Sequence, residues 1–140
     1  MKPNGKFIVT IIMVATLGLL MQIGLAFAAV TVDMTVPSVV TSGVAFTVNV
    51  TVSNDSTTDS ITFNKVAAVY MLMDMKYKGP YEVFTGTRTV GPGLSTSFSF
   101  PFTISYTRGV IVPVALLLFN NTYDFNNAIG YGAVGVSVAK

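Results

Sequence analysis

Strict alternation of apolar and polar residues is the feature that most limits the folds open to this chain. The clearest example is residues 46–52, FTVNVTV, where every second residue is apolar. A period of two places successive side chains on opposite faces of a β-strand. One face of such a strand is buried and the other is exposed to solvent. The same alternation recurs from residue 30 to residue 138.

Turn residues divide the chain after residue 30 into about seven predicted strands. The predicted strands are residues 30–36, 46–52, 61–75, 81–90, 97–104, 110–119 and 129–140. Polar, glycine-rich or proline-rich turns lie between them, chiefly at 53–60, 76–80, 91–93 and 120–127. This spacing is typical of an immunoglobulin-like or fibronectin-like β-sandwich. We therefore predict an all-β chain with a single sandwich domain over residues 29–140.

Several predicted strands carry an irregular feature. The apolar run 61–75 is too long for one ordinary strand, so we expect a bend or bulge near Asn64-Lys65, with a helix as the alternative. Pro101 lacks a backbone donor, which places its strand at a sheet edge or a bulge. Pro113 interrupts a fully apolar strand, which therefore starts late or is kinked. Glycines in the last strand weaken pairing and allow close packing.

Three phenylalanines alternate with polar residues in the fifth predicted strand. Phe98, Phe100 and Phe102 therefore point the same way. Their simplest role is in the core, where each buried ring contributes about 2 to 3 kcal/mol. An exposed aromatic platform for sugars is the alternative.

The first 29 residues have the organisation of an export signal. Two lysines precede an apolar run, residues 7–25, and a small-x-small site follows. These are the parts of a secretory signal peptide, so we predict removal of residues 1–28 by cleavage between Ala28 and Ala29. The alternative is that residues 7–29 remain as a hydrophobic helix in the membrane, since about 20 apolar residues span a bilayer. Under either reading the domain is extracellular.

The composition argues against an enzyme. The chain contains no cysteine and no histidine, which removes disulfides, thiolate nucleophiles and the usual general base and metal ligand. The closest acidic pair, Asp55 and Asp59, lies in the polar segment SNDSTTDS and is read as a solvated turn, with a paired-carboxylate hydrolase site as the alternative. We expect no catalytic residue, no cofactor and no metal site.

The charge balance argues for self-association. Two of the eight basic residues lie in the predicted signal, which leaves six basic against six acidic residues in the domain. No basic patch is visible, so nucleic acid is not an expected partner. A nearly neutral surface places little repulsion between copies of the chain.

Three N-x-[ST] sequons make glycans possible partners of an exported chain. Asn49 lies on the predicted wet face of its strand, whereas Asn54 and Asn120 fall in predicted loops. We expect Asn54 and Asn120 to be modified ahead of Asn49.

Three phrases resemble a known kind of domain. They are VPSVVTSG at 36–43, FTVNVTVSN at 46–54 and GPGLST at 91–96. They are similar to the opening strands and mid-domain turn of secreted immunoglobulin-like surface modules of the CARDB or fibronectin III-like kind. A single module directly after a signal also resembles the subunits of archaeal extracellular filaments, the threads and bundling pili. In those filaments an N-terminal strand of one subunit completes the sandwich of the next.

The resemblance implies a structural subunit of a surface filament or pilus, assembled as a homopolymer. The candidate donor strand is residues 30–36, with the alternating apolar residues Val30, Val32, Met34 and Val36. The alternative is that this segment is the first strand of its own sandwich. Main-chain hydrogen bonds and alternate side-chain pockets would hold a donated strand.

Two other functions remain open. One is a membrane-anchored protein, either type IV pilin-like or from an envelope, in which residues 7–29 are retained. The other is a secreted module that binds carbohydrate or protein through Tyr77, Tyr81 or Tyr123 on loops.

Overall fold

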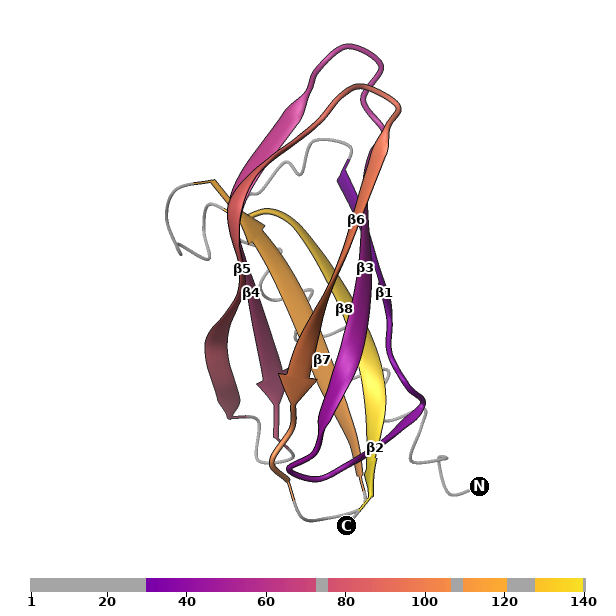
Figure 1. Cartoon of the computed structure of the whole chain (residues 1–140), viewed down its shortest axis with the longest axis vertical. Coiled ribbons are helices and arrows are strands. Elements are labelled where there is room, and N and C mark those ends of the chain that lie inside the picture. Colours follow the sequence, from indigo (N-terminus) through magenta and orange to yellow (C-terminus); the bar gives the residue numbers. More distant parts are fainter. Residues whose placement is uncertain (1–29, 73–75, 107–109, 121–127, 140) are drawn as a thin grey trace, which may run out of the picture.

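The computed structural model describes residues 30–72, 76–106, 110–120 and 128–139. The strands are β1 (Val30–Thr35), β2 (Val39–Thr41), β3 (Ala45–Asn54), β4 (Ile61–Met71), β5 (Tyr77–Val90), β6 (Ser95–Thr103), β7 (Val110–Phe119) and β8 (Ala128–Ala139) (Figure 1). The all-β prediction is confirmed for this part of the chain. None of the described segments is a helix of the length and apolarity that crossing a membrane requires. The predicted signal or anchor lies outside the described residues.

The strands form two sheets that pack face to face as a sandwich (Figure 1). The first sheet has the order β1-β3-β6 and the second the order β2-β8-β7-β4-β5. Neighbouring strands are antiparallel except β2, which runs parallel to β8. The chain therefore changes sheets between β1 and β2, where Pro37 and Ser38 lie.

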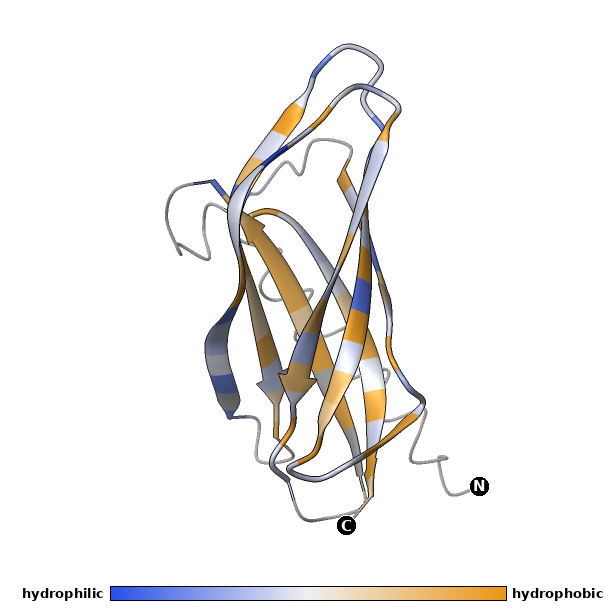
Figure 2. Ribbon diagram, viewed as in Figure 1, coloured by the Kyte–Doolittle hydropathy of each residue, from blue (hydrophilic) through white to orange (hydrophobic). Residues whose placement is uncertain are grey.

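The core lies between the two sheets and is built from the apolar face of each strand. Val48, Val50 and Val52 of β3 are buried, as the alternation predicted. Phe100 and Phe102 of β6 are buried as well, and Phe98 packs half-buried against the core. Figure 2 shows the alternation along β3 and the nearly unbroken hydrophobic run along β7. The core role of the phenylalanines is confirmed.

The structure differs from the predicted strands in two places. Its described residues form eight strands, because β2, which is three residues long and too short to show alternation, was not among the predicted strands. Residues 76–80 were expected to be a turn, but β5 begins at Tyr77 and runs through Gly79-Pro80. A proline fits there because β5 is the edge of its sheet, where the missing donor costs no ladder hydrogen bond.

The irregular features of the other strands follow the sequence. The pairing of β4 with β5 shifts register between Phe63 and Lys65, so the predicted bulge is confirmed and the helix alternative is wrong. Pro101 lies in β6, which is the edge strand of its sheet, as expected. Pro113 lies in β7, one residue beyond the last pair that β7 makes with β4, Tyr70 with Val114. The missing donor therefore falls just beyond the residues that pair with β4.

The five-stranded sheet is apolar on its outer face too. Val69 of β4 and Leu117 and Phe119 of β7 belong to a second buried cluster, with Ala67 and Ala128. The three strands of the other sheet lie on the opposite face of this sheet. This explains why β4 and β7 read as continuous apolar runs rather than alternating ones.

Candidate functional site

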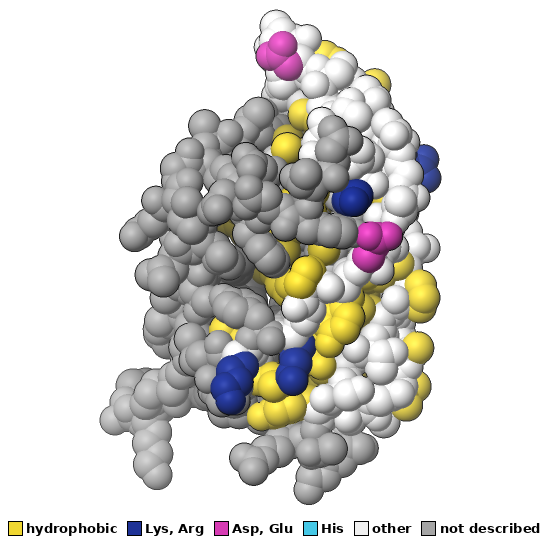
Figure 3. All heavy atoms as spheres, turned by 90° about the vertical axis from the view of Figure 1, so that its left-hand side faces the viewer, with side chains coloured by type: hydrophobic (Ala, Val, Ile, Leu, Met, Phe, Trp, Pro, Cys, Tyr) yellow, Lys and Arg dark blue, Asp and Glu magenta, His cyan; other side chains and the backbone are white. Residues whose placement is uncertain are grey.

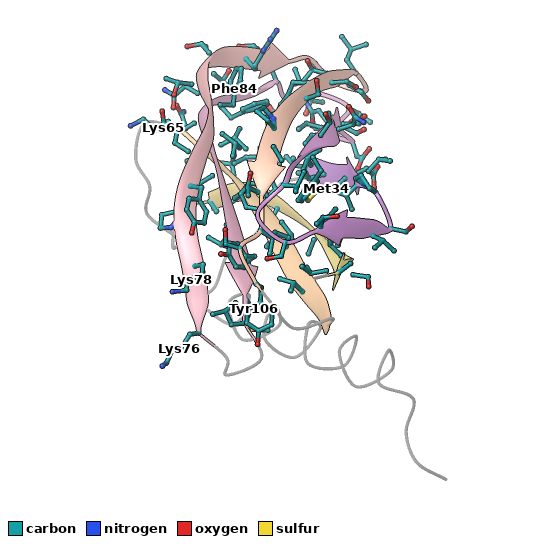
Figure 4. All side chains as sticks on the ribbon, turned by 60° about the horizontal axis from the view of Figure 1, so that its bottom comes forward. Met34, Lys65, Lys76, Lys78, Phe84 and Tyr106 are labelled. Atoms are coloured by element: carbon teal, nitrogen blue, oxygen red, sulfur yellow. The ribbon has the colours of Figure 1, made fainter. Side chains whose placement is uncertain are left out.

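The candidate functional site is the position of β1 at the edge of the three-stranded sheet. β1 pairs with β3 in a register that runs from Val30 opposite Asn54 to Thr35 opposite Asn49. Val32 is buried in the core, and Val30, Met34 and Val36 pack half-buried against it. The shared apolar face predicted for these four residues is therefore confirmed. Figure 4 labels Met34 on β1.

Two glycines of β8 leave room for β1 to lie across the sandwich. A methyl group on Gly130 would come within 2.8 Å of the Val30 Cγ1 atom. A methyl group on Gly132 would collide with the backbone oxygen of Val32 and lie 3.0 Å from its Cγ1 atom. The close packing expected of these glycines is confirmed, and its partner is β1. We call the edge of β3 together with Gly130 and Gly132 the β1 seat.

The structure shows β1 in the self-paired form, on β3 of its own chain. Only residues 36–38 separate it from β2, which is held in the other sheet. The cleavage point at Ala28 and Ala29, which would make β1 the start of the mature chain, lies outside the described residues.

Asn54 is a structural residue, and its placement in a loop is a wrong prediction. It is the last residue of β3 and is 1% exposed. Its amide nitrogen donates to the carbonyl oxygens of Asp59 at 2.7 Å and Val90 at 3.0 Å, and its amide oxygen accepts from the backbone of Ser56 at 3.1 Å. Its backbone also bonds to Gly93 and Leu94 in the turn after β5.

The other two sequon asparagines are exposed. Asn49 lies in the middle of β3 on the outer face of the three-stranded sheet. Asn120 follows the end of β7, and the threonine of its sequon, Thr122, lies outside the described residues.

The acidic pair does not form a carboxylate site. Asp55 accepts a hydrogen bond from the hydroxyl of Thr31 at 2.7 Å, and Asp59 accepts one from Thr58 at 2.9 Å. Each carboxylate is thus engaged with a hydroxyl in or beside the loop after β3. Within the described residues, no three acidic side chains gather closely enough to hold a metal ion.

Of the three tyrosines considered for binding, the exposure of Tyr81 alone is described. It is 42% exposed and lies in β5 rather than in a loop. Its ring stacks on Tyr70 at 6.0 Å between centroids and meets Phe102 edge-on at 5.9 Å. Tyr81 therefore closes one end of the core. Tyr77 begins the same strand, and Tyr123 lies outside the described residues.

No known protein family matches the sequence. No curated protein sequence matches it either. Solved structures match the fold. The CARDB domain of PF1109 from Pyrococcus furiosus, solved by NMR, has a TM-score of 0.53 and 17% identity over 82% of this chain and 98% of that domain. The chain therefore has an immunoglobulin-like fold similar to that of this CARDB domain.

The sporulation control protein Spo0M from Bacillus subtilis is also similar, with a TM-score of 0.59 and 21% identity. The match covers 80% of this chain, which spans half of the Spo0M structure. At these identities the likeness establishes the fold. It confirms the resemblance to CARDB-like modules noted from the sequence.

Proposed function

We propose that this chain is a non-enzymatic structural subunit of an extracellular filament, in which exported copies form a homopolymer by exchanging β1. The β1 seat is the observation that carries the proposal. An edge strand held by one neighbouring strand and a glycine gap can be replaced by the same strand of another copy. Such an exchange preserves every contact of β1, which is why domain swapping is a low-cost route to assembly.

The connection after β1 supports exchange. β1 is joined to β2 by residues 36–38, a short segment that contains Pro37. Proline disfavours the helical conformation in the residue before it and favours an extended chain. Short hinge connections of this kind favour swapping.

The surface properties support association between copies. The predicted domain has six basic and six acidic residues, so its net charge is about zero. A nearly neutral surface places little repulsion between copies of the chain. Figure 3 shows few charged side chains among the described residues on the face it presents. Neither property opposes contact between neutral copies of the chain.

The test uses two single-cysteine variants, because the chain has no cysteine of its own. Asp33→Cys and Thr51→Cys place thiols at residues that lie opposite each other on β1 and β3. Opposite residues have Cβ atoms about 4.5 to 5.5 Å apart, close to the spacing of a disulfide. A filament grown from the two variants together is expected to contain disulfide-linked pairs of unlike chains.

The matched control is a mixture of Thr51→Cys and Ser97→Cys chains. These residues also lie opposite each other, but on β3 and β6, which stay in one chain under the proposal. This mixture should give no pairs of unlike chains. If the first mixture also gives none, while a chain carrying both Asp33→Cys and Thr51→Cys closes an internal disulfide, β1 is self-paired and the proposal fails.

A further inference from the structure

The outer face of the three-stranded sheet consists mostly of small polar side chains. The register places Asp33, Thr51 and Ser97 in one row and Thr35, Asn49 and Ser99 in the next. The outward positions of the sheet are Thr31, Asp33, Thr35, Thr47, Asn49, Thr51, Ser53, Ser95, Ser97, Ser99, Pro101 and Thr103. None carries an aromatic ring or a long side chain. Asp33 is the one charged residue among these outward positions.

Asn49 stands in the centre of this face. It is exposed, and its neighbours across the sheet are the short side chains of Thr35 and Ser99. Its neighbours on the same face of β3 are Thr47 and Thr51. No described neighbour is bulky enough to obstruct a sugar ring attached to the Asn49 amide. The surrounding hydroxyl groups can form hydrogen bonds with the hydroxyls of such a ring.

Asn54 presents the opposite environment. Both hydrogens of its amide nitrogen are used, one toward the Asp59 carbonyl and one toward the Val90 carbonyl. A sugar on that nitrogen would replace a buried hydrogen and separate β3 from the end of β5. Because the Asn54 amide is buried and hydrogen-bonded, it is not accessible for glycosylation in the folded chain.

We propose that Asn49 carries an N-linked glycan and that Asn54 is unmodified. In the modification, Nδ2 of Asn49 bonds to the anomeric carbon of a lipid-linked glycosyl phosphate. The phosphate leaves with the electrons of the broken bond, and the amide loses one proton. The inference rests on export of the chain. Because a glycan would occupy the outer face of the three-stranded sheet, that face points to solvent in any assembly.

The experiment is glycopeptide mapping and intact-mass measurement of the protein purified from its native host. The Asn49 peptide is expected to carry a glycan, and the Asn54 peptide is expected at its unmodified mass. Thr51→Val, which destroys the sequon and keeps a β-branched residue, should lower the mass by one glycan. Thr51→Ser, which keeps the sequon, should leave the glycan in place.

An unmodified Asn49, or a glycan on Asn54, would overturn the inference. The cross-linking test of β1 exchange detects assembly, whereas the intact mass detects modification of Asn49. A polymer with no glycan on Asn49 refutes this inference alone. A glycosylated chain that stays monomeric refutes the filament proposal alone.

Discussion

The side chain of Asn54 joins three segments that are distant in the sequence. It links the end of β3 to the loop at Asp59 and to Val90 at the end of β5, while its backbone holds the turn at Gly93. The sequence signal for this role is an asparagine at a strand end, followed by serine and aspartate, which also describes an ordinary turn. Only the burial of the Asn54 amide distinguishes this structural role from an ordinary turn.

Replacing Asn54 with alanine should destabilise the domain by about 2 to 3 kcal/mol, because two buried carbonyl groups lose their donor. Asn49→Ala, at an exposed position of the same strand, should change the free energy of unfolding by less than about 0.5 kcal/mol. Urea unfolding monitored by circular dichroism measures both. Equal effects would contradict the structural role of Asn54.

Ionisation of Tyr70 makes the stability of the domain depend on pH. Burial raises the pKa of the Tyr70 hydroxyl above its ordinary value of 10.0, and the neighbouring Tyr81 raises this pKa further. The unfolded chain therefore releases the proton at a lower pH than the folded chain does. The contribution of Tyr70 to stability is complete below pH 10 and is lost as the pH rises above it.

We expect the free energy of unfolding to fall as the pH rises above 10, and to fall less in Tyr70→Phe. Phenylalanine keeps the ring packing and has no proton to release. Urea titrations across this range compare the two slopes. Parallel curves for the two proteins would show that Tyr70 does not contribute to the alkaline loss.

At the scale of elements, the fit of β1 is set by β8, which lies in the other sheet. Gly130 and Gly132 looked in the sequence like residues that weaken their own strand. The structure gives them a partner, because β1 crosses them closely enough to exclude a methyl group at Gly132. No local pattern in β8 names β1 as that partner.

Gly132→Ala should destabilise the domain by about 1 to 3 kcal/mol through overpacking against the Val32 backbone. The sign is informative, because alanine in place of glycine within a strand otherwise gains about 0.5 to 1 kcal/mol. Gly130→Ala should cost less, since its new methyl group meets the side chain of Val30 rather than backbone. Hydrogen exchange of the β1 amides should become faster, most of all in Gly132→Ala. Unchanged exchange in Gly132→Ala would contradict the role of Gly132 in the β1 seat.

At the scale of the whole molecule, the balance of charge bears on the proposed association between copies. The domain has six basic and six acidic residues. Long-range attraction between neutral copies is weak and is easily screened.

Assembly should therefore change little between about 0.05 M and about 0.5 M sodium chloride, where the Debye length falls severalfold. Sodium sulfate should strengthen it, because excluded salts favour burial of apolar surface. Light scattering at fixed protein concentration measures both. Dissolution by moderate sodium chloride would show that ion pairs hold the copies together.

The sequence by itself determined that the chain is all-β, which faces of β3 and β6 enter the core, the bulge in β4 and the edge position of Pro101. These features depend on side-chain period and backbone chemistry within a few residues. Only the tertiary structure decided that Asn54 is buried, that β5 continues through Gly79-Pro80, and that Gly130 and Gly132 receive β1. Each of these depends on a partner from a distant part of the chain, and contact between remote segments is fixed by how the two sheets pack.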